Sequence, residues 1–280
     1  MSDRVALVTG ASSGIGAATA LGLVELGFTV YGAARRVERM GHLAERGVRT
    51  IALDVTDERS VRDAVDRIVA DTGRIDVLVN NAGYGSYGAV EDVPMDEARR
   101  QFEVNVFGAA RLIQLVLPVM RSRGAGRVIN VSSVGGKIYT PLGAWYHATK
   151  FALEGFSDAL RLEVEPFGVD VVVIEPGGIR TEWAGIAVDN LRKVSRRGVY
   201  ARQAEAVASR LSSETYTRRM SEPSVIAEVI GRAATVSRPR TRYAAGLGAK
   251  PLVLLRRLLP DRALDAIIRR ALREVSGPAR

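Results

Sequence analysis

Short runs of β-branched and other apolar residues alternate with longer amphipathic stretches over the first two-thirds of the chain. Such alternation is typical of βαβ units, in which helices join parallel strands. A parallel strand that is covered on both faces should be apolar throughout, as Val171-Val172-Val173-Ile174 is. The sequence therefore predicts an α/β fold with a doubly wound parallel sheet of about seven strands and helices on both faces.

The same pattern predicts where the elements lie. Strands are expected at 4–9, 28–33, 48–53, 75–80, 126–132, 168–174 and 241–246. Helices are expected at 14–27, 57–72, 96–122, 144–166 and 223–236. The Arg-rich stretch 183–221 is only weakly periodic, and 251–275 form two further helical patterns after the last strand. We therefore expect one domain over 1–250, with an insertion at 182–221, and a basic helical extension over 251–280.

Composition excludes several kinds of site. The chain has no cysteine and two histidines, so we expect neither a disulfide nor a Cys/His metal site. The apolar run at the N-terminus is too short for a signal peptide, and no stretch reaches the ~18 uninterrupted apolar residues of a spanning helix. The cytoplasm is therefore the expected location.

Charge is unevenly distributed. Residues 1–190 hold 20 Lys/Arg and 24 Asp/Glu, whereas 191–280 hold 20 and 7. Arginines border an apolar helical face in the tail, and this arrangement predicts packing against the domain or a partner subunit, with association with a membrane surface as the alternative. No nucleic-acid-binding motif accompanies the arginines, so nucleic acid is not an expected partner. The apolar face comprises Leu264, Ile267, Ile268, Ala271 and Leu272.

The first predicted strand ends in the turn Thr9-Gly10-Ala11-Ser12-Ser13-Gly14-Ile15-Gly16, and a predicted helix follows. In such a turn Gly10 permits a sharp bend, Gly14 lets the backbone approach a pyrophosphate, and Gly16 allows close packing of helix and strand. The helix N-terminus offers free N–H groups and a partial positive charge to the phosphates. The turn therefore predicts a dinucleotide site whose cofactor-binding residues are Gly10, Ser12, Ser13, Gly14, Ile15 and Gly16.

Together with motifs further along the chain, this turn resembles the short-chain dehydrogenase/reductase family, whose common form has TGxxxGIG here. The resemblance spans residues 4–182 and implies a single Rossmann-type domain that binds a nicotinamide cofactor. Asp54-Val55 matches the pair that meets the adenine ring, and Asn80-Asn81-Ala82-Gly83 matches the family's NNAG, which borders the cofactor. The resemblance therefore adds Asp54, Val55, Asn81, Ala82 and Gly83 to the expected cofactor-binding residues.

Tyr146 and Lys150 are four residues apart and would lie on one face of the predicted helix 144–166. A phenol normally keeps its proton to about pH 10. A nearby ammonium and an oxidised nicotinamide would favour the phenolate, so that the tyrosine can act as acid and base. The resemblance implies that Lys150 also holds the nicotinamide ribose, and both residues are expected to contact the cofactor.

Two further polar residues complete the predicted catalytic set. Ser133 follows a predicted strand, where its hydroxyl can donate to the substrate oxygen. Ser132 is the competing assignment, and we favour Ser133 because the family's serine is usually the second of a Ser-Ser pair. Asn105 matches the family's helix asparagine, which helps to carry a water-linked proton relay. The predicted catalytic residues are Asn105, Ser133, Tyr146 and Lys150.

The segment Pro176-Gly177-Gly178-Ile179-Arg180-Thr181 resembles the family's PG motif. The resemblance implies that the Ile179 backbone and the Thr181 hydroxyl meet the nicotinamide carboxamide, with Pro176 and Gly177 also at the cofactor. The insertion 182–221 would cover the substrate. Its apolar residues, such as Trp183, suit a lipophilic alcohol or ketone, and ordinary packing of a lid helix is the alternative. The motifs look like the branch that contains hydroxysteroid and retinol dehydrogenases, and relatives are often homo-oligomers built on the two long helices.

The choice of cofactor is predicted from the end of the second strand, Gly32-Ala33-Ala34-Arg35-Arg36. An acidic residue here binds the ribose hydroxyls of NAD, whereas arginine accommodates the 2′-phosphate of NADP. Ala34 stands where NAD-preferring relatives commonly carry Asp, so we expect Arg35 and Arg36 to bind NADP(H) in preference to NAD(H). Ser13 argues the other way, because some NADP-dependent relatives have a basic residue at that turn.

The predicted function is therefore an NADP(H)-dependent oxidoreductase that interconverts a secondary alcohol and a ketone, or an alcohol and an aldehyde. The alternative is a non-catalytic dinucleotide sensor that binds partners through the same fold. A degenerate family member should have lost the tyrosine or the lysine, and here both are intact.

Overall fold

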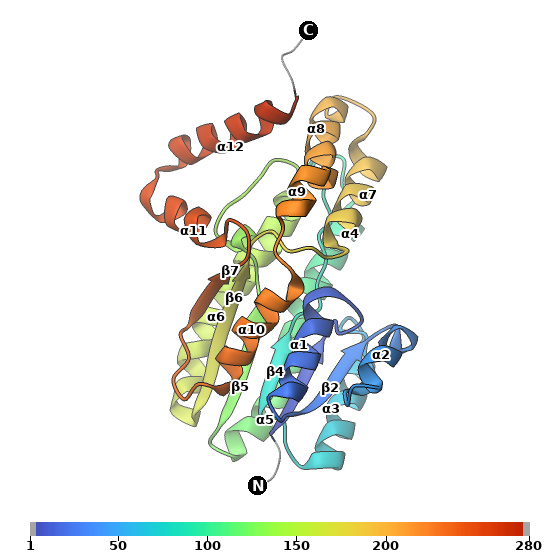
Figure 1. The fold of residues 1–280 in the computed structure, drawn as a ribbon, viewed down its shortest axis with the longest axis vertical. Helices are drawn as coiled ribbons and strands as arrows, with labels where there is room; N and C mark the ends of the chain where they lie inside the picture. Colours follow the sequence, from blue (N-terminus) through green and yellow to red (C-terminus); the bar gives the residue numbers. More distant parts are fainter. Residues whose placement is uncertain (1–3, 277–280) are drawn as a thin grey trace.

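The computed structural model describes the backbone of residues 4–276 and the side chains of residues 4–271. Its centre is a seven-stranded sheet of parallel strands in the order β3-β2-β1-β4-β5-β6-β7 (Figure 1). The direction of winding reverses between β1 and β4, which is where open α/β sheets bind ligands. The strands are β1 (Val5–Thr9), β2 (Thr29–Ala34), β3 (Arg49–Ala52), β4 (Val77–Asn80), β5 (Gly126–Val131), β6 (Val169–Pro176) and β7 (Arg242–Ala245).

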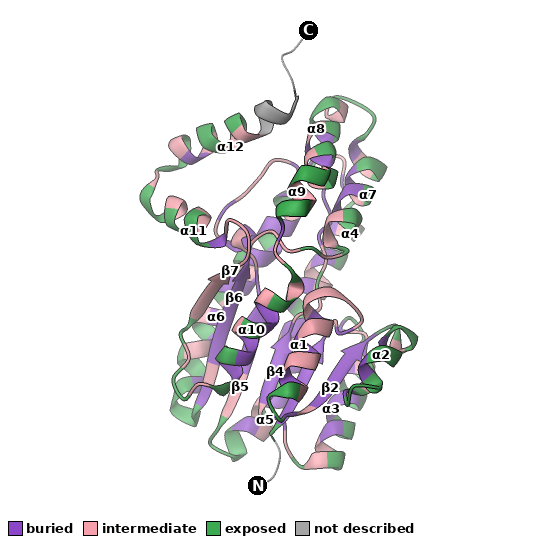
Figure 2. Cartoon of the chain, in the orientation of Figure 1, coloured by how far each residue is buried: buried purple, intermediate pink, exposed green. Residues whose placement is uncertain are grey.

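Helices cover both faces of the sheet, and the buried strands lie between them (Figure 2). One apolar layer joins the sheet to α3 (Glu58–Thr72), α5 (Gly108–Ser122) and α6 (Ala144–Val164). The other layer joins it to α1 (Gly14–Glu25) and α10 (Pro223–Thr235). The doubly wound fold predicted from the sequence is confirmed.

Two features of the helices were not predicted. A 3-10 turn (Val37–Met40) and the short helix α2 (Gly41–Ala44) connect β2 to β3, and they are too short to show a helical period. The single helix expected at 96–122 is divided into α4 (Met95–Phe102), a π turn (Glu103–Phe107) and α5. A π turn closes i→i+5 hydrogen bonds and is frequent at functional sites. Asn105 lies within it.

Met95–Ser122 also has the length and hydropathy of a membrane span, the one such stretch among the described residues. One such helix is weak evidence of a membrane protein, because a core helix passes the same test. Here Leu112, Ile113 and Val116 are almost completely buried against the sheet. This packing accounts for part of the apolar composition, since 33% of the apolar window is buried.

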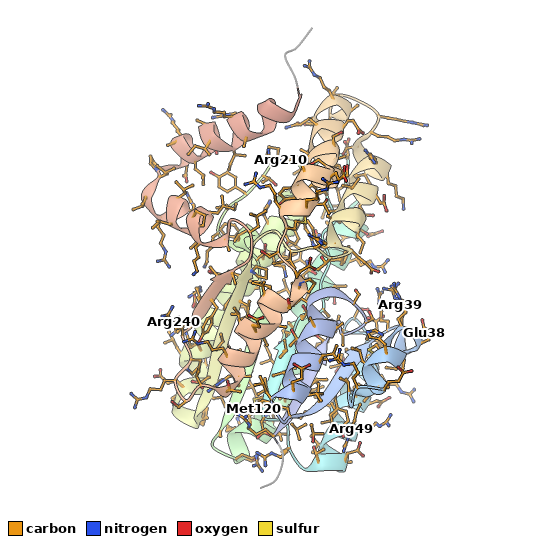
Figure 3. The ribbon with its side chains drawn as sticks, in the orientation of Figure 1. Glu38, Arg39, Arg49, Met120, Arg210 and Arg240 are labelled. Carbon is orange, nitrogen blue, oxygen red and sulfur yellow. The ribbon has the colours of Figure 1, made fainter. Side chains whose placement is uncertain are left out.

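Five helices form the insertion and the C-terminal extension, at one end of the molecule (Figure 1). The extension is anchored on the rest of the protein, because Leu264 is only 2% exposed and the Tyr139 hydroxyl donates to Asp265 Oδ1 at 3.0 Å. Arg210, labelled in Figure 3, donates to the carbonyl of Ala271. Of the apolar face predicted for the extension, the Leu272 side chain lies outside the described residues. The five helices are α7 (Trp183–Ser195), α8 (Ala201–Ser212), α9 (Glu214–Arg219), α11 (Ala249–Leu258) and α12 (Asp261–Ser276).

Candidate active site

The glycine-rich turn leads from the end of β1 into α1, at the carboxyl edge of the sheet. Gly10 has a φ of 66°, which favours glycine. A Cβ at Gly16 would lie 2.2 Å from the Gly10 carbonyl oxygen, so helix and turn pack together as closely as predicted. Asn81 fixes the turn from the neighbouring β4, because its Nδ2 donates to the Thr9 carbonyl at 3.0 Å. Thr9 Oγ1 in return accepts the N–H groups of Asn81 and Ala82.

The start of α1 suits a dinucleotide pyrophosphate. Ser13 is the N-cap, and within the described structure its side chain makes no capping hydrogen bond to the first turn of the helix. The first turn also carries no acidic residue, so its N–H groups and partial positive charge face an anion without competition from a fixed carboxylate of that helix. Gly14 packs closely against the segment after β6, because a Cβ there would lie 3.0 Å from Thr181 Cγ2.

Arg35, Arg36 and Asp54 lie at the adenosine end of this edge, after β2 and β3. Both arginine side chains are exposed. Burial raises the pKa of the Asp54 carboxyl, but hydrogen bonds from Thr56 and the positive charge of Arg35 outweigh burial and hold the pKa below its usual value. The structure therefore brings Arg35 and Asp54, both expected at the adenosine, close together. Val55, also expected there, is buried.

The segment after β6 lies at the opposite end of the same edge. Pro176 is the last residue of β6, and the Gly177 N–H donates to the Ala245 carbonyl of β7 at 2.9 Å. Ile179 bridges to Ser221, which fixes the path of the chain toward Thr181. Arg180, in the same segment, forms an ion pair with Glu222 at 2.8 Å.

Tyr146 and Lys150 lie on successive turns of α6 with buried side chains, as predicted. Lys150 Nζ donates to the Val131 carbonyl at 3.0 Å. Burial lowers the pKa of this ammonium to about 8, against the negative charge of Glu154, which raises it. The ammonium therefore stays largely protonated at pH 7. Lys150 and Asn105 both face Gly83, where a Cβ would lie 3.7 Å from Nζ and 3.1 Å from Asn105 Oδ1.

Burial raises the pKa of Tyr146 to about 12, and the nearby Ser133 hydroxyl lowers it. The structure therefore brings together two residues that the sequence assigned to one site. In the protein alone the shift is therefore opposite to the one expected from a nearby ammonium, because loss of hydration penalises the phenolate. Ser132 makes no such contact, since its Oγ is buried without a hydrogen-bond partner among the described residues.

Asn105 is held by both ends of its side chain. Its Oδ1 accepts the Tyr84 N–H at 3.0 Å, and its Nδ2 donates to the Tyr84 carbonyl at 2.9 Å. Nδ2 also donates to Thr149 Oγ1 at 3.0 Å, and Thr149 directly precedes Lys150 in α6. This geometry ties the π turn to the helix that carries Tyr146 and Lys150. Thr149 is a contact that the sequence motifs did not reveal.

His147, next to Tyr146 in α6, is a buried structural residue. Its Nδ1 lies 2.9 Å from the Gly135 carbonyl oxygen, and its Nε2 accepts the Thr140 N–H at 3.0 Å. Burial lowers the pKa of the imidazole, which keeps it neutral at pH 7. His147 thereby holds the loop that follows Ser133 against α6.

Aromatic side chains surround the Tyr146 ring. Trp183, the first residue of α7, has its ring centroid 5.1 Å from that of Tyr146. Tyr87 completes the group, at 5.9 Å from Tyr146 and 5.7 Å from Trp183. Sequence analysis had placed Trp183 among the substrate-covering residues but missed Tyr87, because no motif marks the loop after Gly83. Tyr146 is consequently 7% exposed.

A family model described as short chain dehydrogenase matches residues 4–191. The chain belongs to the short-chain dehydrogenase/reductase family. Among curated relatives, "Probable short-chain type dehydrogenase/reductase VdlC" of Helicobacter pylori is 34% identical over 265 residues, covering 95% of this chain and 96% of that protein. The 3-ketodihydrosphingosine reductase of Bacteroides thetaiotaomicron is 44% identical over 182 residues, 65% of this chain and 66% of that protein.

Solved structures agree with this assignment. A short-chain dehydrogenase from Streptomyces avermitilis has a TM-score of 0.80 at 35% identity and covers 98% of this chain and 96% of its own. Actinorhodin polyketide ketoreductase, solved with NADPH, has a TM-score of 0.70 at 30% identity and covers 86% of this chain and 94% of its own. The chain is therefore an NAD(P)-dependent oxidoreductase, and its particular branch within the family stays a prediction.

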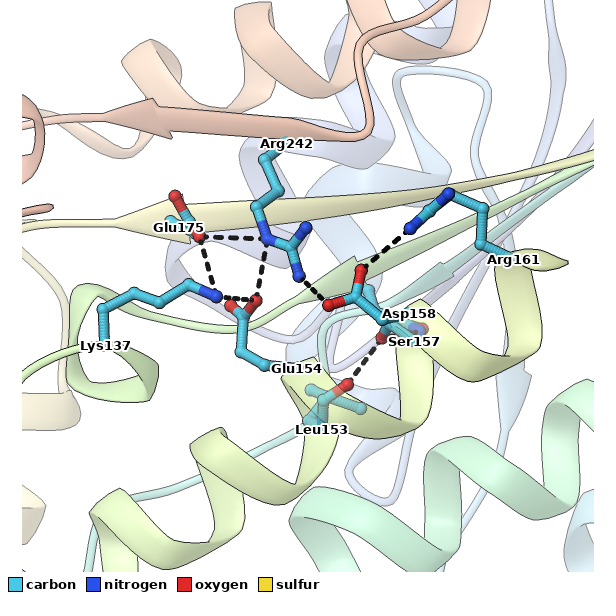
Figure 4. A network of polar contacts seen from close by, with 9 residues as sticks. Lys137, Leu153, Glu154, Ser157, Asp158, Arg161, Glu175 and Arg242 are labelled. Atoms are coloured by element: carbon cyan, nitrogen blue, oxygen red, sulfur yellow. Dashed lines mark hydrogen bonds and ion pairs between the residues drawn. The ribbon is translucent and has the colours of Figure 1, made fainter. Parts of the chain in front are cut away.

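Behind the catalytic helix, this short-chain dehydrogenase/reductase buries a network of charges (Figure 4). Glu154 of α6 and Glu175 of β6 are 5% and 3% exposed. Lys137 reaches them at 2.8 and 3.7 Å, and Arg242 of β7 at 3.1 and 3.5 Å. Arg242 also pairs with Asp158 at 2.6 Å. The network joins the loop after Ser133, the helix of Tyr146 and the last strand of the sheet.

Proposed function

We propose that this short-chain dehydrogenase/reductase interconverts a lipophilic secondary alcohol and its ketone, or an alcohol and an aldehyde, with NADP(H) as the preferred cofactor. The observation that carries the proposal is the placing of the buried phenol of Tyr146 near the Ser133 hydroxyl, with Lys150 buried one helical turn away. A tyrosine, a serine and an ammonium together can exchange a proton with a substrate oxygen and stabilise charge that develops there.

Each residue has a defined part in the proposed reaction. The bound nicotinamide supplies or accepts the hydride. Ser133 donates a hydrogen bond to the substrate oxygen, and Tyr146 gives that oxygen a proton in the direction of reduction or takes one in the direction of oxidation. Because burial keeps the phenol protonated, the free protein starts in the form that reduction needs. Lys150 holds the nicotinamide ribose, and Asn105 and Thr149 position Lys150 and connect it to water.

The proposed cofactor site follows the edge of the sheet. The turn Gly10–Gly16 and the start of α1 hold the pyrophosphate, Asn81-Ala82-Gly83 border the middle of the cofactor, and the segment from Pro176 to Thr181 meets the nicotinamide. The described residues support this placement, because the cradle at Gly16 admits no Cβ and the first turn of α1 carries no carboxylate.

NADP(H) is the proposed choice because Arg35 and Arg36 are exposed after β2, beside Asp54, and because the related polyketide ketoreductase was solved with NADPH. The ratio of kcat/KM for NADPH and NADH tests it. Ala34→Asp should shift this ratio toward NADH by about tenfold or more, since one charged hydrogen bond to a ribose hydroxyl contributes about 1.5–3 kcal/mol. A wild-type preference for NADH would contradict the proposal.

A lipophilic substrate is supported by the surroundings of Tyr146. Tyr87 and Trp183 lie against its ring, and Leu142 and Val188 belong to the same apolar cluster. These side chains would offer few hydrogen-bond partners to the hydroxyl groups of a polar substrate. The relative named 3-ketodihydrosphingosine reductase agrees with a long-chain ketone. We therefore place long-chain and polycyclic ketones first in the substrate panel.

The decisive experiment measures NADPH oxidation with a panel of ketones and aldehydes. Tyr146→Phe should reduce turnover by about two orders of magnitude or more while NADPH affinity changes little, because the ring remains and the proton donor is lost. Tyr31→Phe is the matched control, since it removes a phenol that is hydrogen-bonded to Asp71, away from the site. Unchanged turnover in Tyr146→Phe would refute the assigned chemistry. No observation favours the non-catalytic sensor considered from the sequence.

We also propose a homo-oligomer that uses the long helices. Phe107, at the end of the π turn, is 47% exposed, and Phe151 of α6 is 43% exposed. Two exposed aromatic rings on neighbouring helices suit a contact with a second copy. Phe151→Glu should lower the molar mass measured by light scattering, and an unchanged mass would exclude this surface.

Three expectations from the sequence stay predictions. They are the catalytic domain at 1–250, the substrate-covering insertion at 182–221 and the cytoplasmic location.

A further inference from the structure

One ion pair joins the segment after β2 to the segment after β6, at the edge of the sheet where the dinucleotide is proposed to bind. Arg39, from the 3-10 turn after β2, donates to Glu182 Oε1 at 2.9 Å. Glu182 is the N-cap of α7, in the segment that follows β6. Figure 3 labels Arg39 on the β2 side of the molecule. The sheet order places β1, β4 and β5 between β2 and β6, so the two strands lie about 19 Å apart. The pair therefore spans the width of the proposed dinucleotide site.

The same pair stands over the pyrophosphate turn. The Ser13 hydroxyl donates to Glu182 Oε2 at 3.5 Å, so one carboxylate lies between Arg39 and the N-cap of α1. Thr181, the preceding residue, lies against Gly14 of that turn. The Glu182 carboxylate thus lies across the mouth of the phosphate site, and the positive end of α1 attracts it. A dinucleotide has to pass the Arg39–Glu182 pair to enter or leave this site.

We propose that Arg39 and Glu182 form a clasp that must open for the dinucleotide to enter or leave. The clasp rests on the proposed cofactor site at the glycine-rich turn. Opening moves the Glu182 carboxylate off Ser13 and releases Arg39. Because Trp183 follows Glu182 and lies on Tyr146, the same movement loosens the cover of the catalytic tyrosine. Exchange of cofactor and access of substrate are thereby linked through the first residues of α7.

Two simpler roles make different predictions from the clasp. If Arg39 bound the 2′-phosphate, its removal would affect NADPH and spare NADH. If Glu182 only repelled the pyrophosphate, its neutralisation would slow cofactor release. A clasp instead slows both entry and exit, and its two members act as one unit, so either substitution should have the full effect.

The test is stopped-flow fluorescence on the full-length protein. Bound NADPH is chased with excess NADP⁺, bound NADH is chased with excess NAD⁺, and association is measured separately. Glu182→Gln, Arg39→Met and the double variant should each raise association and dissociation rates by about two- to fivefold with both dinucleotides, the range for a half-exposed ion pair. The matched control is Arg46→Met, which breaks the exposed pair with Glu25 at the other end of α1 and should leave both rates unchanged.

Each outcome decides the matter. Three results would overturn the clasp but not the cofactor site. NADPH release could be slower in Glu182→Gln, or the effect of Arg39→Met could be confined to NADPH. In the double variant, the effect of Arg39→Met could also add in full to that of Glu182→Gln. Unchanged rates in all variants would do the same. Absence of NADPH and NADH binding to the wild-type protein would overturn the proposed cofactor site, and the clasp with it.

Discussion

Arg242→Met removes the central cation of the buried network in Figure 4. Among the described residues, Glu154 and Glu175, at 5% and 3% exposure, are then left with Lys137 as the one cation within ion-pair distance. Breaking a buried ion pair by removing one partner costs about 3–5 kcal/mol. At an unfolding entropy of about 2.1 cal/mol/K for each residue, this loss lowers the Tm of a 280-residue chain by about 5–8 °C.

The Tm deficit of Arg242→Met should depend on pH, and the pKa of Glu175 sets the direction. Burial, and then the charge of Glu154, raises the pKa of Glu175 above its unfolded value. A carboxyl with a raised folded pKa binds a proton more tightly in the folded state, so it costs stability as the pH rises through that range. Removing Arg242 raises this pKa further. The Tm deficit of the variant should therefore be largest near neutral pH and shrink under acid conditions.

Thermal unfolding between pH 5 and pH 8 measures both effects. Arg242→Met/Glu175→Gln should recover most of the lost Tm at pH 7, because the remaining buried carboxylate still has Lys137 at 2.8 Å. Arg218→Met is the matched control, since it breaks a pair with Glu214 in which both side chains are more than three-quarters exposed. A Tm loss as small as that of Arg218→Met, or no recovery in the double variant, would refute the reasoning.

Three further predictions concern the site. NADPH affinity, measured by fluorescence, should weaken as the pH rises through about 8, because the Lys150 ammonium loses its proton there; Lys150→Arg should show no such inflection. Gly16→Ala should lower Tm and NADPH affinity, because the new Cβ would lie 2.2 Å from a backbone oxygen; the expected loss of folding free energy is about 1–3 kcal/mol. Gly22→Ala is the control and should raise Tm slightly, because a Cβ there has no neighbour within 4 Å. Asn105→Ala should cut kcat more than it changes KM for NADPH, because the Asn105 amide no longer donates to Thr149. If Asn105→Asp, which lacks the amide donor, restored kcat, this role of the amide would be contradicted.

Sequence reasoning succeeded where function depends on local spacing. The glycines of the first turn, the four-residue step from Tyr146 to Lys150 and the place of Ser133 after a strand all follow from short-range geometry. The parallel sheet was predictable for a similar reason, since continuous apolar runs mark strands covered on both faces. The choice of Ser133 over Ser132 is supported by the effect of the Ser133 hydroxyl on the pKa of Tyr146 and by the burial of Ser132 Oγ without a partner among the described residues.

The rest depends on contacts between distant segments. Arg39 and Glu182 are 143 residues apart, both are partly exposed, and no pattern in either segment indicates the other. Tyr87 meets Tyr146 only because the loop after Gly83 and the start of α7 converge on α6. The direction of the Tyr146 pKa shift was also beyond the sequence, because it depends on how completely the ring is desolvated.

The π turn at Glu103–Phe107 makes the length of the chain a constraint in its own right. A π turn holds one residue more than an α turn, so loss of one of these five would let the segment close ordinary i→i+4 hydrogen bonds while α4 and α5 keep the faces that they present. The apolar face of α5 would then stay on the sheet, but the wider turn that carries Asn105 toward Thr149 would be lost. A deletion here should therefore leave the fold intact and damage the site, whereas a deletion within α5 itself would turn its apolar face away from the sheet.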